Sequence, residues 1–146
     1  MATRTARTAW NGTLQQGSGQ VELSSSKVGT YPVSFPKRTA DNADGTTSPE
    51  ELIAAAHSSC FAMQLSAMIA EAGGTPDSLE VTANVSLGPD PAGGLRLTGI
   101  ALKAVGEVSG LDKAGFEQAA QKAKNTCPVS KALTGVEISL ETEYVG

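Results

Sequence analysis

The chain has few of the side chains that most protein chemistry uses. Its 146 residues include one histidine, His57, and two cysteines, Cys60 and Cys127. A zinc or iron site built from His and Cys needs several such ligands, so we expect no metal site of this kind within one chain. A hydrolase of the Ser-His-Asp type would have to use His57.

Aromatic residues and positive charges are also scarce. There are three Phe, two Tyr and one Trp, and 11 Lys and Arg face 15 Asp and Glu, for a net charge of −4. Proteins that bind nucleic acids use basic stripes and stacking rings, so no nucleic-acid partner is expected. The length and the 40% apolar content fit a single domain over residues 1–146 with a core of its own.

Signals for export or membrane insertion are missing too. Residues 1–10 contain no apolar run of the kind that a secretory signal needs, which favours a cytoplasmic protein. Residues 52–70 carry no charge, but His57, several serines and many alanines interrupt the apolar character that a membrane span requires. We therefore expect no membrane partner and interpret this segment as the central helix of a soluble fold.

The first third of the chain has the patterns of strands and turns. The Asn11-Gly12 pair predicts a two-residue hairpin turn, because both residues tolerate positive φ. Apolar and polar residues alternate over residues 20–24 and again over 31–35, where a proline favours an edge strand. The polar residues 36–47 predict a loop.

A long helix follows and has well-marked ends. Ser48 is a good N-cap, Pro49 suits the first helical position, and Glu51 completes a capping box. The helix should continue to about Ala72, where a glycine pair ends it.

The rest of the chain alternates between strands and helices. The patterns predict strands at 79–87, 95–108 (with a bend at Gly99) and 136–144, and helices at 113–125 (capped by Asp112) and 128–133. The sequence thus predicts the α+β class.

The position of Cys60 on the long helix bears on its role. On a helical wheel, Glu50, His57, Cys60, Gln64 and Glu71 fall on one polar stripe less than a quarter-turn wide. In the cytoplasm a stable structural disulfide is unusual, so the two cysteines are either inert buried thiols or a redox or catalytic pair. A place at the edge of the polar stripe weakens the interpretation as an inert core thiol and leaves both interpretations open.

Cys127 and His57 each allow two interpretations. If Pro128 begins a helix, Cys127 is its N-cap, where the positive helix end favours a thiolate; otherwise Cys127 is a plain loop cysteine. His57 lies one helical turn before Cys60, which permits a Cys-His pair for acyl transfer. No orienting acid is evident, so we favour a histidine that is hydrogen-bonded to the sheet.

Two segments resemble the signatures of the OsmC/Ohr hydroperoxide reductases. Residues 48–61 place Pro49-Glu50 ten residues before Cys60, and residues 123–130 contain Cys127-Pro128-Val129-Ser130. The resemblance covers essentially the whole chain and is closest to the OsmC branch. It implies an OsmC-like α+β fold, with strands packed around a long central helix, that forms an intertwined homodimer with its sites at the interface.

The resemblance also implies a function and a set of site residues. Cys60 matches the peroxidatic cysteine, Cys127 the resolving cysteine, Glu50 the family glutamate, and Arg38 the arginine that pairs with it. Such an enzyme reduces organic hydroperoxides and hydrogen peroxide through a Cys60 sulfenic acid and a Cys60–Cys127 disulfide, in defence against oxidative and osmotic stress. A dithiol, a lipoyl protein in the Ohr branch, reopens the disulfide, and no cofactor is needed.

Helix geometry gives a reason for the dimer. Glu50 and Cys60 are ten residues apart, about 15 Å along a straight helix, so an Arg38–Glu50 pair does not easily reach Cys60 of its own chain. We expect two sites per dimer, each with Cys60 and Cys127 from one subunit and Arg38 and Glu50 from the other. A non-enzymatic redox sensor with the same disulfide, and a Cys60-His57 acyl-transfer enzyme, remain the alternatives.

Overall fold

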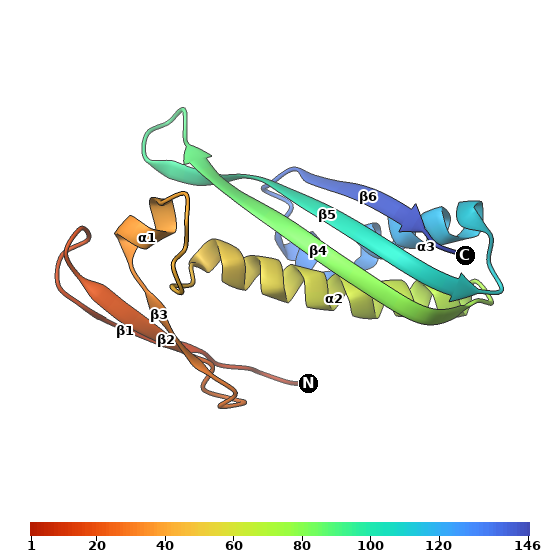
Figure 1. The fold of residues 1–146 in the computed structure, drawn as a ribbon, viewed down its shortest axis with the longest axis horizontal. Helices are drawn as coiled ribbons and strands as arrows, with labels where there is room; N and C mark the ends of the chain where they lie inside the picture. The colour runs from red at the N-terminus through yellow and green to blue at the C-terminus, as the bar shows by residue number, and fades with distance from the viewer. The chain divides into compact units, whose positions relative to one another are not determined.

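The computed structural model describes all residues from 1 to 146 and divides them into two compact units, residues 1–52 and 53–146 (Figure 1). The elements are β1 (Arg7–Asn11), β2 (Ser18–Glu22), β3 (Thr30–Val33), α1 (Phe35–Thr39), α2 (Pro49–Glu71), β4 (Thr75–Pro89), β5 (Leu95–Ser109), α3 (Lys113–Thr126), α4 (Pro128–Ala132) and β6 (Ile138–Tyr144). The α+β class is confirmed.

The first unit is built on an antiparallel sheet in the order β1-β2-β3, and β3 is an edge strand, as its proline predicts. The prediction of a two-residue hairpin turn at Asn11-Gly12 is wrong. Asn11 stays in β1 and pairs with Ser18, so the connection spans residues 12–17. Gly12 takes the positive φ of +96°, and the Gly17 amide donates to the Thr13 carbonyl at 2.7 Å, which closes this longer turn.

The loop predicted for residues 36–47 begins as a short helix, so that prediction is wrong over α1. The Ser34 hydroxyl accepts from the Lys37 amide at 3.3 Å and caps the helix, and Pro36 supplies a helical φ in the first turn. The strand expected through Phe35 consequently stops at Val33.

The long helix α2 has the predicted ends. The Ser48 hydroxyl accepts from the Glu51 amide at 3.1 Å, and Gly73 ends the helix with a φ of +91°. By length and composition alone α2 could cross a membrane, since an 18-residue window has a mean hydropathy of 1.4. However, Phe61, Leu65 and Ile69 are fully buried, so in the second unit this helix is part of a protein core.

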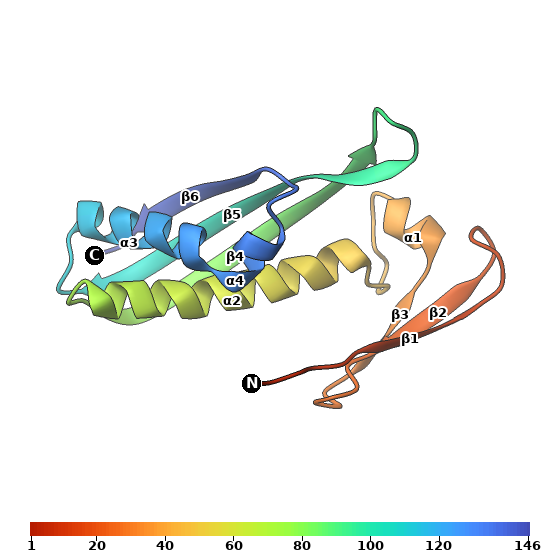
Figure 2. The same ribbon diagram turned by 180° about the vertical axis from the view of Figure 1, so that it is seen from behind.

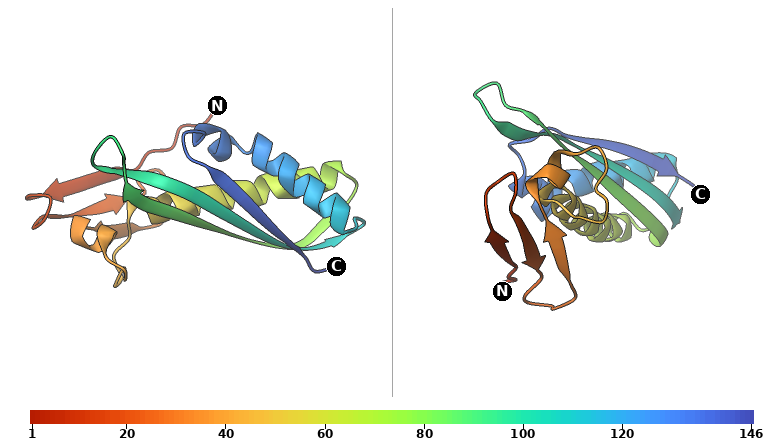
Figure 3. Two further views of the ribbon diagram at one scale, coloured as in Figure 1. Left: turned by 90° about the horizontal axis from the view of Figure 1, so that it is seen from above. Right: turned by 60° about the vertical axis from the view of Figure 1, so that its left-hand side comes forward.

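The second unit packs three helices on one face of a three-stranded sheet, as Figures 2 and 3 show. β4 and β5 form an antiparallel pair, whereas β5 and β6 are parallel and are therefore joined by a crossover through α3 and α4. A register shift opposite Ser86 and Leu87 leaves Thr98 unpaired beside Gly99, which confirms the predicted bend.

The core of this unit lies between the helices and the sheet. Alternate β5 residues point inward, and α3, capped by the Asp112 carboxylate at 2.8 Å from the Gly115 amide, contributes one apolar face. The buried core residues are Phe61, Leu65, Ile69, Ile100, Leu102, Ala104, Val108, Phe116, Ala119, Ala120, Ala123 and Cys127. One of the two cysteines is therefore itself a core residue.

Candidate active site

Two cysteines that are 67 positions apart in the sequence meet in the second unit. Cys60 lies in the middle of α2, and Cys127 lies at the junction of α3 and α4. Their sulfur atoms are 3.2 Å apart, and both residues are free thiols. Cys127 is fully buried, whereas Cys60 is partly exposed, so Cys60 is the more accessible of the two residues.

Two hydrogen bonds fix α2 against the α3–α4 junction on either side of the sulfur atoms. His57 Nε2 lies 2.7 Å from Ser130 Oγ, and Gln64 Nε2 donates to Thr126 Oγ1 at 2.8 Å. His57 is one turn before Cys60 and Gln64 one turn after it. The two helices consequently cannot slide past one another without losing one of these bonds, and the register that brings the sulfurs together is held from both ends.

At His57 and Gln64 the polar stripe of α2 is turned inward, so these two residues do not form a solvent-exposed polar face. His57 is fully buried and Gln64 is half-buried, because both bond to the α3–α4 junction. The open surface of α2 instead carries small and apolar side chains, namely Ala56, Ser59, Met63 and Ala67. The expectation that His57 bonds to the sheet is wrong, since its partner is Ser130 in α4.

The surroundings of the two thiols shift their acidities in opposite directions. Burial raises the pKa of Cys60; the Val129 amide opposes this, and the Cys127 thiol adds to it. Burial by itself also raises the pKa of Cys127, but the nearby Ser130 amide, Cys60 thiol, Ser130 hydroxyl and Val129 amide outweigh it, so the net pKa is lowered. None of the groups that shift Cys60 is a cation.

The junction after α3 has the form that the sequence predicts, with Cys127 as N-cap and Pro128 as the first residue of α4. The Cys127 side chain makes no capping hydrogen bond. The amides of Val129 and Ser130 at this end of α4 nevertheless lower the pKa of the thiol.

The other two predicted site residues form an ion pair within the first unit. Arg38 Nε donates to Glu50 Oε1 and Oε2 at 2.9 and 3.1 Å, and Nη2 lies 2.8 Å from Oε1. The Glu50 side chain is only 10% exposed, against 32% for Arg38. The short helix α1, which the sequence did not indicate, is the element that carries Arg38.

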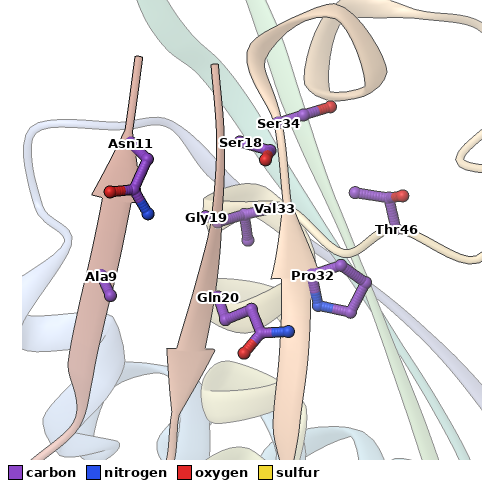
Figure 4. Close-up of a pocket in the computed structure, with 9 residues that line it drawn as sticks. All are labelled: Ala9, Asn11, Ser18, Gly19, Gln20, Pro32, Val33, Ser34 and Thr46. Carbon is purple, nitrogen blue, oxygen red and sulfur yellow. The ribbon is translucent and has the colours of Figure 1, made fainter.

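A hollow in the first unit offers no comparable chemistry. It has a volume of about 430 Å³ and lies over one face of the β1-β2-β3 sheet (Figure 4). Its lining holds amide and hydroxyl side chains such as Asn11, Gln20 and Thr46, but no charged residue and no cysteine. No group of three or more His, Cys, Asp or Glu is placed to hold a metal ion.

Sequence reasoning did not identify the residues that surround the sulfur pair. Ser130 belongs to the Cys-Pro-x-Ser motif, yet no role followed from the motif alone. Its position three residues after Cys127 puts both side chains at the first turn of α4, and this spacing is the signal that could have pointed to it. The helical repeat places Gln64 on the face of Cys60, but nothing in the sequence marks its partner Thr126.

The chain matches known proteins over most of its length. The family described as OsmC-like protein matches residues 41–142. Peroxiredoxin OsmC of Escherichia coli (strain K12) is 44% identical over 90% of this chain and 90% of its own length. The organic hydroperoxide resistance protein OhrA of Bacillus subtilis (strain 168) is 35% identical over 82% and 84%.

A solved structure has the same fold. The crystal structure of an organic hydroperoxide resistance protein from Elizabethkingia anophelis superposes with a TM-score of 0.79 at 29% identity, over 99% of this chain and 97% of the other. The predicted OsmC-like fold is thereby confirmed. With a family match over residues 41–142 and a relative at 44% identity, this chain belongs to the OsmC/Ohr family of OsmC-like proteins.

Proposed function

We propose that this protein is a thiol-dependent peroxidase that reduces organic hydroperoxides, and hydrogen peroxide as well, in cytoplasmic stress defence. The observation that carries the proposal is the 3.2 Å separation of Cys60 Sγ and Cys127 Sγ in a chain of this family. The relatives named peroxiredoxin OsmC and organic hydroperoxide resistance protein support the same chemistry.

The first step uses Cys60, the more exposed of the two cysteines. Its thiolate attacks one oxygen of the peroxide, the O–O bond breaks, and the alkoxide leaves as an alcohol after it takes up a proton. The sulfur loses two electrons and becomes a sulfenic acid. With hydrogen peroxide the product is water.

The second step uses Cys127. Its thiolate attacks the Cys60 sulfur, the S–O bond breaks, and the hydroxide leaves as water after it takes up a proton. The sulfurs already lie 3.2 Å apart, and a disulfide needs about 2 Å, so small side-chain movements close the bond. An external dithiol then reduces the disulfide by exchange and returns both thiols.

The first step requires a thiolate at Cys60, although burial raises the pKa of this thiol within the second unit. In the proposed homodimer, Arg38 of a second chain supplies the missing positive charge, and Glu50 of that chain orients the guanidinium. The observed Arg38–Glu50 pair and the separation of ten positions between Glu50 and Cys60 in α2 support this assignment of roles.

Steady-state kinetics test the activity. Rates with cumene hydroperoxide, tert-butyl hydroperoxide and hydrogen peroxide are measured with dihydrolipoamide and with thioredoxin as reductant. We expect catalytic turnover that Cys60→Ser abolishes, whereas Ser59→Ala, a change on the open face of α2, serves as the matched control. Stoichiometric oxidation without turnover by any of these reductants would refute the enzyme and favour the redox sensor.

Mixed dimers test the shared site. A Cys60→Ser chain and a Glu50→Ala chain are each inactive alone, but a dimer of the two contains one site with every group intact. Recovery of activity on mixing is expected, at about half of the wild-type value per mixed dimer because one site of two is complete. Absence of recovery would place all four residues of a working site in one chain.

A further inference from the structure

A buried histidine that the proposed reaction does not use lies beside the sulfur pair. His57 is 0% exposed, and Nε2 lies 2.7 Å from Ser130 Oγ, whereas Nδ1 is buried without any hydrogen-bond partner. Ser130 is itself only 5% exposed. Since His57 is three residues before Cys60 and Ser130 three after Cys127, the polar pair bridges α2 and α4 alongside the two sulfurs.

The bare Nδ1 atom determines which way the hydrogen bond runs. If Nε2 accepted from Ser130, the ring proton would sit on Nδ1, and a buried N–H without an acceptor costs the full desolvation of a donor. If Nε2–H donates to Ser130 Oγ, Nδ1 keeps only an unused lone pair, which is the less costly state. Burial lowers the pKa of His57, so the ring stays neutral in this tautomer.

This direction leaves the Ser130 hydroxyl proton free. Ser130 lies at the first turn of α4, and its hydroxyl, together with its amide, is among the groups that favour the Cys127 thiolate. The hydroxyl can donate to the sulfur only when its own proton is not used by the imidazole. Since Ser130 follows the N-cap Cys127 by three residues, on the first turn of α4, this tautomer permits a donor chain from His57 through Ser130 to Cys127.

We propose that His57 is a positioning residue for the resolving cysteine: its Nε2–H donates to Ser130 Oγ and thereby aims the Ser130 hydroxyl at Cys127 Sγ. The catalytic use of this chain rests on the proposed peroxidase function. Cys127 must be a thiolate to attack the sulfenic acid, and it is the leaving thiolate when a reductant attacks Cys60 of the disulfide. One donor chain favours the anion in both steps.

The tautomer can be observed directly, because His57 is the only histidine in the chain. Long-range ¹H–¹⁵N correlation spectra of the uniformly ¹⁵N-labelled, reduced protein report the protonation state of each ring nitrogen. We expect the neutral Nε2–H form throughout pH 6 to 8. An Nδ1–H tautomer, or an imidazolium in this range, would overturn the proposal.

The effect on Cys127 is measured by thiolate absorbance in a Cys60→Ala background, which removes the one titratable group that shifts Cys127. Ser130→Ala and His57→Leu should each raise the apparent pKa of Cys127 by about one unit, a tenfold loss of thiolate below the pKa. His57→Gln, whose amide can donate to Ser130, should restore most of it. Thr126→Val removes the hydrogen bond on the other side of the sulfurs and should have no such effect.

Single-turnover kinetics separate this role from a purely structural one. In the otherwise unchanged chain, Ser130→Ala and His57→Leu should leave the rate of sulfenic acid formation within about twofold and slow disulfide closure about tenfold. Equal slowing of both steps, or an unshifted Cys127 in all variants, would overturn the proposal. If the tautomer and the Cys127 shift are found but no peroxide turnover, the peroxidase function fails and the donor chain stands.

Discussion

Replacement of Arg38 by methionine tests the ion pair that joins α1 to the first turn of α2. The guanidinium makes three contacts of 2.8 to 3.1 Å with the Glu50 carboxylate. Because the Glu50 side chain is only 10% exposed, little water is available to replace the lost cation. Loss of the Arg38 cation alone should therefore destabilise the fold more than loss of both charges.

The exposure of the two side chains sets the size of the effect. Breaking a fully buried ion pair costs about 3–5 kcal/mol. The Arg38 side chain is 32% exposed, so water enters beside Glu50 when it is shortened, and we expect about 2 kcal/mol for Arg38→Met. Glu50→Gln alone and the double replacement should each cost about 1 kcal/mol, which makes the coupling energy about 2 kcal/mol.

Thermal unfolding of the four reduced proteins, followed by circular dichroism at one chain concentration, measures this coupling. For a chain of this size, about 2 kcal/mol lowers Tm by about 4–8 °C. The pair Lys37–Asp44 in the same segment is the control, since its side chains are 42% and 57% exposed, and its coupling should stay below about 1 kcal/mol. If the Arg38 and Glu50 replacements are additive, or couple no more strongly than the control pair, the reasoning is refuted.

Three other outcomes can be checked with single replacements. Cys127→Ser should leave the first reaction of Cys60 with peroxide intact but allow oxidation to the sulfinic acid, which mass spectrometry detects; a Cys60 that stops at sulfenic acid in excess peroxide would contradict the resolving role. Met63 is 70% exposed in one chain, so if a second chain covers this face, Met63→Lys should convert dimer to monomer in sedimentation velocity, whereas Met63→Leu should not. Burial lowers the pKa of His57; as the pH falls below about 6.5 the unfolded chain takes up a proton that the folded chain does not, so the free energy of unfolding should fall with a limiting slope of about 1.4 kcal/mol per pH unit. His57→Gln should remove this contribution to the pH dependence. Equal slopes of the free energy of unfolding for both proteins between pH 6.5 and 5 would contradict the prediction.

Helix boundaries were predictable where local hydrogen bonds set them. Ser48 and Asp112 accept amide protons three residues ahead, at Glu51 and Gly115, and Gly73 ends α2 with a positive φ. Each of these interactions lies within a few residues of the chain, so the sequence pattern contains all of its participants.

The first unit was less predictable because its short elements depend on their neighbours. A five-residue helix such as α1 is marginal by itself, and the pairing of Asn11 with Ser18 competes with the tight turn that Asn11-Gly12 favours. The helical conformation of α1 is accompanied by two interactions. Ser34 caps the helix, and Arg38 pairs with Glu50, which lies 12 residues further along the chain.

The sequence by itself determined the ends and the phase of α2. The phase follows from the helical repeat and places Cys60, His57 and Gln64 on one face. The sequence also carried the two cysteine motifs by which the family can be identified. Only the tertiary structure decided that this polar face packs inward against the α3–α4 junction, where His57 meets Ser130 and the sulfurs meet at 3.2 Å. A helical wheel gives the angle of each side chain about its axis, but what covers each face depends on residues more than 60 positions away, and no local interaction encodes that contact.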